Sequence, residues 1–347
     1  MRLFKRIALV LLVLLIFYVG YILNSSGFFR VVEPLFDGTI LHRIPIKGAE
    51  DIMVSREDSF ALISATERLI YPPDTEEKGG LYLIDLTKND FTPIPLTDSF
   101  EQPFAPHGIS FIKKDSTYLV MAINHTLAGH SIEVFELYDQ RLTHIETRKH
   151  PSMIQPNDLV LIDENRFYFT NDHGYTEGLG KLAEEYLGLA LSNVVYFDGQ
   201  DYREVDNGIA YANGINVDPA RNLLYVASPR HFLVKVYTRN TDGSLSFIEN
   251  IPCATGVDNI DLDEAGHLWI GAHPNLLRFA AYAKGRKATT PSEVIKIDYR
   301  GRGDYSIEQI YVEKGDEMSG STVAVAFGNL VFVGNVMDEA FLVLALQ

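Results

Sequence analysis

The chain has 347 residues and a mass of 39.0 kDa, enough for one large domain or two modest ones. A hydrophobic fraction of 46% allows a substantial core and excludes an intrinsically disordered chain. The formal net charge is −16, and residues 31–347, with 26 basic and 46 acidic side chains, carry −20. A body this acidic repels phosphate backbones, which excludes general nucleic-acid binding. Cys253 is the only cysteine, which excludes an intramolecular disulfide and a multi-cysteine zinc site.

The amino-terminal segment is predicted to cross a membrane. Residues 7–23 carry no charge, and Arg2, Lys5 and Arg6 precede them, which favours a cytoplasmic amino end. A cleaved signal peptide is the alternative, but residues 24–27 lack a typical cleavage site. We therefore predict a cytoplasmic flank at 1–6, an uncleaved signal anchor at 7–23, a linker at 24–40 and a domain at 41–347. This domain is expected on the extracytoplasmic side, in a periplasm, a secretory lumen or at the cell surface.

The rest of the chain is predicted to be mostly β-structure. One helix is expected at 179–191, where apolar residues recur at helical spacing. Elsewhere short β-rich runs are separated by Gly, Asn, Asp and Pro. Predicted strands include 81–86, 131–137, 193–197, 232–237, 294–299 and 307–312.

A longer unit, two strands joined by a turn, recurs six times. Its intervals are 57, 50, 56, 45 and 63 residues. Six units of about four strands each predict an all-β fold, a six-bladed β-propeller. Two tandem sandwiches are the alternative, but they would not explain the sixfold recurrence. The units open at Glu50, His107, Asn157, Asn213, Asp258 and Ser321.

In a propeller these six openers would form a polar ring at one mouth of the central channel. Carboxylate and amide oxygens that converge on one point suit a hard cation, calcium above all. The alternative is that these residues only cap strand ends and bind channel water; the sixfold repetition favours the metal.

Three openers belong to adjacent polar pairs: Glu50-Asp51, Asn157-Asp158 and Asp258-Asn259. Neighbours on a strand point to opposite sides, so one member of each pair can face the channel mouth while the other lies at a different depth of the channel. Two metal sites are therefore plausible. For Asp51 and Asp158, a hydrogen bond at a turn or strand end is an equally good interpretation.

Two histidines belong to one unit. His107 opens it and His125 ends its second strand, so the two can meet near the ring. A lone histidine is usually structural, but one beside a metal with a near-neutral pKa is a credible general base.

Familiar catalytic motifs are missing from the sequence. It contains no G-x-S-x-G and no H-E-x-x-H. Gly178-Leu179-Gly180 opens the expected helix, but no βαβ pattern surrounds it, so a dinucleotide site is not expected.

Ten short strings in one order carry a family resemblance. They are Glu50-Asp51, FAPHGIS (104–110), INH (123–125), PNDLV (156–160), TNDHG (170–174), YLGLALSNVVY (186–196), ANGIN (212–216), VDNI (257–260), WIGAHPN (269–275) and GSTVA (320–324). Together they resemble the paraoxonase/arylesterase family of calcium-dependent lactonases, from about residue 47 to the end. The amino-terminal hydrophobic segment also resembles that family's. The resemblance implies a six-bladed propeller with two calcium ions.

The resemblance also implies a role for individual residues. His107 and His125 match the family's histidine dyad, Tyr71 an aromatic residue on a loop over the site, and Asp172 and His273 positions that line it. The structural calcium would be held by Asp51, Asp158 and the backbone carbonyl of Ile109. The catalytic calcium would be held by Glu50, Asn157, Asn213, Asp258 and Asn259.

One departure concerns ring closure. Vertebrate members join their ends with a disulfide, and Cys253 does not match either disulfide position. Closure is therefore expected to rest on strand pairing between the segment at 42–46 and the final strand at 340–346.

The expected activity is hydrolysis of lactones and aryl esters. Calcium would polarise the carbonyl while His107, assisted by His125, takes a proton from water. Apolar walls and the membrane anchor favour a small lipophilic substrate, such as an acyl-homoserine lactone or another aliphatic lactone. The alternatives are a sugar lactonase of the gluconolactonase type and a non-catalytic propeller with structural calcium.

Overall fold

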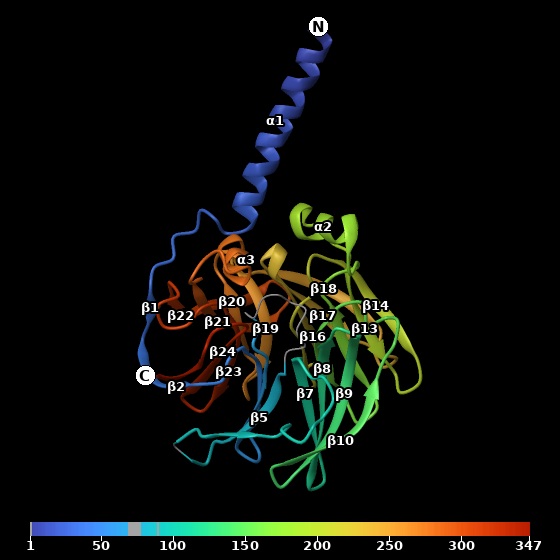
Figure 1. Ribbon diagram of the computed structural model, residues 1–347, viewed down its shortest axis with the longest axis vertical. Coiled ribbons are helices and arrows are strands. Elements are labelled where there is room, and N and C mark those ends of the chain that lie inside the picture. Colours follow the sequence, from blue (N-terminus) through green and yellow to red (C-terminus); the bar gives the residue numbers. More distant parts are fainter. Residues whose placement is uncertain (1, 69–77, 89) are drawn as a thin grey trace.

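The computed structural model describes residues 2–68, 78–88 and 90–347, as a β-rich body with three α-helices on one end (Figure 1). The helix α1 (Arg2–Ser25) projects away from that end, where α2 (Gly178–Leu187) and α3 (Leu276–Ala283) also lie. A 3₁₀ turn, η1 (Pro229–His231), completes the helical elements of the described chain. Helix α2 ends four residues earlier than predicted because Gly188 adopts a left-handed conformation, φ 66°, and its N–H bonds to the carbonyl of Glu184.

The strands form six antiparallel sheets within the described residues. The first sheet contains β3 (Ala49–Ser55), β4 (Phe60–Ala65), β5 (Gly80–Asp85) and β6 (Pro93–Pro95); the second β7 (Pro106–Lys114), β8 (Thr117–Thr126), β9 (Gly129–Tyr138) and β10 (Arg141–Arg148); the third β11 (Pro156–Leu161), β12 (Phe167–Asn171), β13 (Ser192–Phe197) and β14 (Tyr202–Ile209). The fourth contains β15 (Ile215–Asp218), β16 (Leu223–Ser228), β17 (Leu233–Arg239) and β18 (Leu245–Pro252); the fifth β19 (Gly256–Leu262), β20 (Leu268–His273), β21 (Ser292–Gly301), β22 (Asp304–Glu313) and β1 (Leu35–Phe36); the sixth β23 (Ser321–Phe327), β24 (Leu330–Asn335), β25 (Phe341–Leu346) and β2 (Gly38–Ile44).

The first strand of each sheet faces the centre of the body. Strand β3 contacts β7, β7 contacts β11, and the contacts continue through β15, β19 and β23 back to β3. This closed ring confirms the six-bladed β-propeller predicted from the six repeats.

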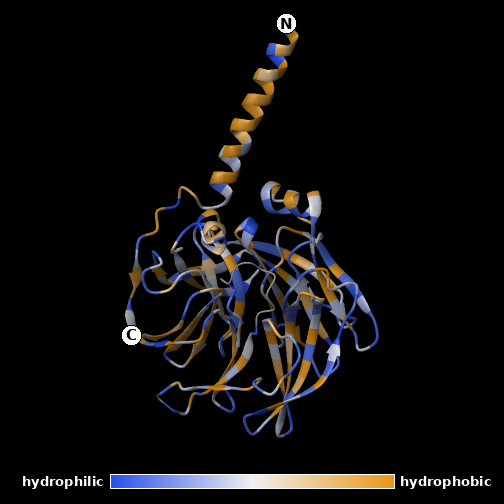
Figure 2. Ribbon diagram, in the orientation of Figure 1, coloured by the Kyte–Doolittle hydropathy of each residue, from blue (hydrophilic) through white to orange (hydrophobic). Residues whose placement is uncertain are grey.

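Apolar side chains fill the space between neighbouring blades. The buried residues form six clusters within the described chain, one at each interface between adjacent sheets. Because each blade is covered on both faces by its neighbours, all five residues of β12 are buried instead of alternating between buried and exposed. In Figure 2 the hydrophobic colour accordingly runs along the strands of the body. The same colour covers most of α1, whose side chains are not buried by the body.

The two ends of the domain pair in one sheet. Strand β2 runs antiparallel to β25, with Ile44 opposite Phe341 and Arg43 opposite Leu342. Backbone hydrogen bonds between these strands therefore close the ring, as the sequence predicted in the absence of a disulfide. Phe341 and Leu342 are fully buried, so apolar packing reinforces the closure.

The segment after α1 is tied to the fifth blade. The carbonyl of Ser26, a residue only 2% exposed, accepts a hydrogen bond from the backbone N–H of Leu276, 2.9 Å away. The guanidinium of Arg30 makes two bonds, 2.6 and 2.7 Å long, to the buried carboxylate of Glu293. Strand β1 then pairs with β22. The anchor helix is thus joined to the body through a short segment that packs on it.

Replacement of Arg30 by methionine tests this attachment. The change leaves the Glu293 carboxylate buried without its cation, and we expect a loss on the order of 2–3 kcal/mol in the free energy of unfolding. Arg43→Met is the matched control, because the Arg43–Glu317 pair is about half exposed on both sides and should contribute about 1 kcal/mol or less. Urea unfolding of the full chain in detergent measures both, and equal losses would show that the Arg30 pair is not a structural tie.

Candidate metal centre and active site

The inner strands share a local irregularity at the positions of the predicted openers. The register between first and second strand shifts between Ala49 and Asp51 in the first blade and between Pro106 and Ile109 in the second. The same shift occurs at 156–159, 257–260 and 321–324. Such a shift inserts an unpaired residue and re-aims side chains, as β-bulges do beside active sites. Five blades therefore present polar side chains to the channel from a widened strand end.

Two glycines allow the inner strands to approach one another at this level. A β-carbon on Gly108 would lie 2.6 Å from Cα of Asp158, and one on Gly214 would lie 2.6 Å from Cα of Asn259. Each glycine directly follows an opener, His107 or Asn213, so the motif supplies both a polar side chain and the close approach of the strands. Larger residues would push apart the strands that carry the site.

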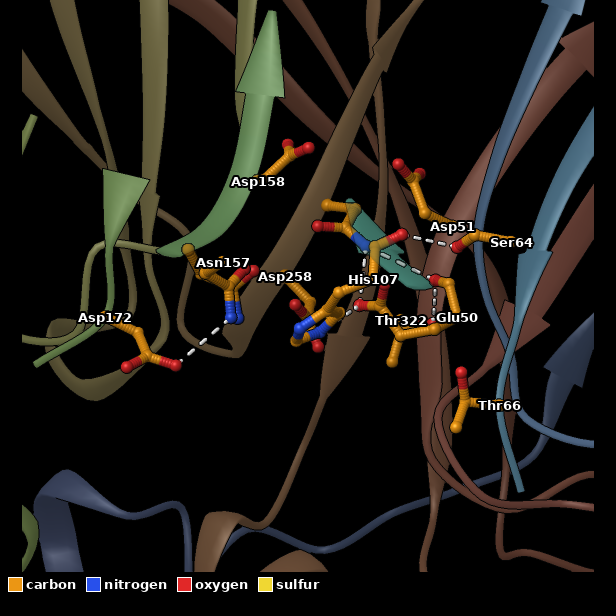
Figure 3. Close-up of polar contacts among 12 residues, drawn as sticks. Glu50, Asp51, Ser64, Thr66, His107, Asn157, Asp158, Asp172, Asp258 and Thr322 are labelled. Atoms are coloured by element: carbon orange, nitrogen blue, oxygen red, sulfur yellow. Dashed lines mark hydrogen bonds and ion pairs between the residues drawn. The ribbon is translucent and has the colours of Figure 1, made fainter. Parts of the chain in front are cut away.

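Five buried side-chain oxygens in this region have no hydrogen-bond partner among the described residues, and Figure 3 labels three of the residues that carry them, Glu50, Asn157 and Asp258. Unpaired buried oxygens are costly, so a set of five calls for a cation. Two carboxylates and three amides suit calcium in number and in kind. They are Glu50 Oε2, Asn157 Oδ1, Asn213 Oδ1, Asp258 Oδ1 and Asn259 Oδ1, all on residues no more than 6% exposed.

Neighbouring groups orient these oxygens. Asn259 donates its Nδ2 to Oε1 of Glu50 at 2.9 Å, and Oδ2 of Asp258 lies 2.8 Å from Nε2 of His273. Asn157 donates Nδ2 to Asp172 at 3.3 Å. The second polar atom of each of these groups is thereby engaged, and the remaining oxygen is left for a ligand.

A second pair of carboxylates lies at another level of the channel (Figure 3). Asp51 accepts the backbone N–H of Ile109 at 2.8 Å, and Asp158 accepts those of Leu159 at 2.7 Å and Ile215 at 2.8 Å. Burial, reinforced by Asp158 and Glu50, raises the pKa of Asp51 well above 3.8. Burial likewise raises the pKa of Asp158. The two acids repel each other unless a cation lies between them.

Burial and neighbouring charges also shift the pKa values of Asp258 and Glu50. Burial raises the pKa of Asp258, with partial compensation from His273. Burial acts in the same direction on Glu50, but the charges and hydrogen bonds of His107, Arg68 and Asn259 outweigh it and lower the pKa of Glu50. No cluster of three or more His, Cys, Asp or Glu suited to a metal occurs among the described residues, and three of the five unpartnered oxygens belong to amides, which such a cluster does not count.

The predicted histidine pair is formed. Nδ1 of His107 lies 3.0 Å from Nε2 of His125, and Nε2 of His107 lies 3.1 Å from Oε1 of Glu50. The His107 side chain is 16% exposed, so the channel mouth can reach it. Burial lowers the pKa of His125 well below 6.5, which keeps that imidazole neutral at pH 7. The pair therefore joins the Glu50 carboxylate to a neutral imidazole.

Of the remaining predicted residues, Asp172 and His273 are buried and bond to Asn157 and Asp258. Asp172 bonds to Nδ1 of its neighbour His173 at 2.6 Å, and the ring of His273 stacks on Phe279 with a centroid distance of 3.8 Å. Ser321 opens its strand as expected, but its hydroxyl donates to the carbonyls of Glu293 and Ala272 within the sheets. Tyr71 lies outside the described residues.

Two further residues face the site without having been predicted. Tyr211, two residues before Asn213, has a positive φ of 63° and packs edge-on against His173. The charge of Asp172, followed by burial, raises the pKa of Tyr211 well above 10. Thr322 donates its hydroxyl to the carbonyl of Glu50 at 2.6 Å. The available signal was that Thr322 lies in the GSTVA string and that Tyr211 directly precedes the ANGIN string.

Comparison with known proteins agrees with this geometry. A family model described as Arylesterase matches residues 37–344. Human serum paraoxonase/arylesterase 1 is 32% identical over 305 residues, which cover 84% of each chain, and chicken serum paraoxonase/arylesterase 2 is 31% identical with the same coverage.

Solved structures of lower identity share the fold. A luciferin-regenerating enzyme superposes with a TM-score of 0.56 at 11% identity, over 91% of this chain and 96% of that one. A calcium-binding protein, regucalcin from Agrobacterium tumefaciens, superposes with a TM-score of 0.54 at 13% identity, over 90% and 95%. The family match confirms the resemblance seen in the sequence and the predicted class of enzyme, an esterase, and it agrees with the expected binding of calcium. The chain belongs to the arylesterase family.

Proposed function

We propose that this protein is a calcium-dependent hydrolase of lactones and aryl esters. The observation that carries the proposal is the convergence of five unpartnered oxygens beside the His107–His125 pair. A purely structural metal site has no need of an imidazole pair at its open side.

Two ions are proposed. The first would be held by the five converging oxygens, and the second by Asp51 and Asp158 together with the backbone of Ile109. When bound at the first site, calcium supplies a Lewis acid that polarises the ester carbonyl and stabilises negative charge on its oxygen.

Side chains of the protein would take up the proton that the attacking water loses. In the tautomer that the proposal requires, His107 would donate Nδ1–H to Nε2 of His125, 3.0 Å away, and its Nε2 lone pair would accept a proton from water. The Nε2–H so formed lies 3.1 Å from Oε1 of Glu50, and the carboxylate stabilises the imidazolium. Asp172 and His273 orient Asn157 and Asp258 through hydrogen bonds.

Exposed apolar side chains favour a lipophilic substrate. Leu179, Leu182 and Tyr186 of α2 are 85%, 49% and 57% exposed, on the end of the propeller from which α1 projects (Figure 1). The hydroxyl of Tyr18 in α1 donates to the carbonyl of Tyr186 in α2, so the two helices are in contact at this end of the propeller. We propose that this end rests on the extracytoplasmic membrane surface and takes aliphatic lactones that partition into the bilayer.

The base is tested with His107→Gln. We expect kcat for lactones and aryl esters to fall by about 100-fold or more, because the proton acceptor is lost. His150→Gln is the control, since that exposed ring stacks on Tyr202 outside the site and its loss should leave kcat unchanged.

Hydrolysis is measured with calcium, with a chelator and after calcium is restored. Turnover that survives His107→Gln would retain the metal and reject His107 as the base. Preference for aldonolactones over aliphatic lactones would indicate a sugar lactonase. No turnover by the folded, calcium-loaded protein would indicate a binding module.

Calcium removal and pH test the second ion. The pKa of Asp51 is raised on folding, so in the metal-free protein the unfolded chain ionises first, and stability falls as pH rises above 3.8 toward the folded pKa. The metal-free wild type should therefore lose more stability between pH 5 and pH 7 than metal-free Asp51→Asn, a comparison in which histidine titrations common to both cancel. Equal pH dependence of the two unfolding temperatures would contradict the raised pKa.

Calcium stoichiometry gives an independent count. Titration calorimetry of the full chain should find two ions in the wild type and one in Asp51→Asn. Saturating calcium should raise the unfolding temperature of the wild type by mass action. A single ion in both proteins would restrict the metal to the five-oxygen site.

Cysteine labelling tests the orientation. Cys253 is buried, and burial raises the pKa of its thiol to about 12, so the native thiol should stay silent. In intact cells an impermeant maleimide should label Lys149→Cys on the propeller and should not label Lys5→Cys. The reverse pattern would place the propeller in the cytoplasm.

A further inference from the structure

A third histidine continues the His107–His125 pair. Strands β8 and β9 form a hairpin in which His130 lies directly opposite His125. The turn between Thr126 and Gly129 is tight, and its geometry is fixed by the Thr126 hydroxyl, which donates to the carbonyl of Gly129 at 3.0 Å. Nδ1 of His130 lies 2.8 Å from Nδ1 of His125, with ring centroids 4.8 Å apart. Three imidazoles therefore form one hydrogen-bonded row.

The hydrogen bonds of this row can run in either of two directions. A neutral imidazole has one N–H and one lone pair, so its two contacts must be one donation and one acceptance. If each ring donates outward, His107 gives Nδ1–H to His125, and His125 gives Nδ1–H to His130. If each donates inward, Nε2 of His107 donates its hydrogen to Oε1 of Glu50, 3.1 Å away, and cannot accept a proton. Only the outward direction makes His107 a base, and it requires a lone pair on Nδ1 of His130.

We propose that His130 is a positioning residue for the hydrolysis: by accepting Nδ1–H of His125, it holds both other imidazoles in the tautomers that leave Nε2 of His107 ready for a proton. This inference rests on the proposed function. It also gives the proton taken up at Nε2 of His107 an exit. The Nδ1 proton of His107 passes to Nε2 of His125, the Nδ1 proton of His125 passes to Nδ1 of His130, and His130 releases its Nε2 proton to solvent. One proton enters the row and one leaves, and the rings then return to their first tautomers before the next turnover.

The surroundings of His130 suit an acceptor. Burial, the first cause, and the charges of Lys181 and His107 lower its pKa, while Asp172 acts in the opposite sense. The outcome is a neutral ring at pH 7. The charge of Arg68 further disfavours a proton on His125. His130 is half-buried beside Leu127, a turn residue that is 64% exposed, so solvent is close.

Two substitutions separate acceptance from packing. His130→Phe removes the acceptor, and we expect kcat to fall by about 10- to 100-fold with little change in KM. The acidic limb of the pH–kcat profile should move to lower pH, because the protonated row loses one of the rings that share its charge. His130→Asn keeps an oxygen that can accept from His125 and should recover most of kcat. Calcium affinity and unfolding temperature should match the wild type in both variants.

A direct measurement keeps this inference distinct from the proposed function. In the calcium-loaded full chain with ¹⁵N-histidine, the outward direction requires an unprotonated Nδ1 on His130 and a protonated Nδ1 on His125. Active wild type with an unchanged His130→Phe pH profile, or the opposite tautomers in the spectrum, would overturn the role of His130. A wild type without turnover would overturn the proposed function, and the spectrum would still decide the direction of the row.

Discussion

Negative charge buried at the centre of the propeller is the constraint on which this molecule depends. The carboxylates of Glu50, Asp51, Asp158 and Asp258 are all buried where the inner strands meet. Their repulsion must be held in check by a cation and by a scaffold that cannot spread. The scaffold is the closed ring of inner strands, joined by the pairing of β2 with β25 and by apolar packing at every blade interface. Fold stability and metal binding are therefore two aspects of one balance.

The chemistry of the site follows from which of its groups carry charge and which are neutral. Amides supply oxygens without adding charge, so three asparagines can join two acids around one ion. His107 lies within reach of Glu50 on one side and His125 on the other, which connects the metal centre to a row of neutral imidazoles. The proposed row would let a proton leave without passing the five unpartnered oxygens.

Repetition is what made the fold and much of the site readable from sequence. The six openers predicted the propeller, and the paired polar residues at 50–51, 157–158 and 258–259 lie where the unpartnered oxygens and the second acid pair are found. Ser321 fits the repeat, yet its hydroxyl serves the sheets, because a repeat marks a position and not the direction of a side chain. The Arg30–Glu293 contact spans 263 positions and has no local pattern. The position of His130 opposite His125 depends on the register of a two-residue turn. The end of α2 depends on the conformation of a single glycine, Gly188.

Closure by backbone pairing also changes where the protein can fold. A ring held by a disulfide requires an oxidising compartment and an enzyme that forms the bond. Here the bonds between β2 and β25 are indifferent to redox potential, and Cys253, buried with a pKa raised to about 12, offers little thiolate for exchange. The propeller can mature without thiol oxidation. Loss of calcium, rather than exposure to reductant, is then the event that would release it.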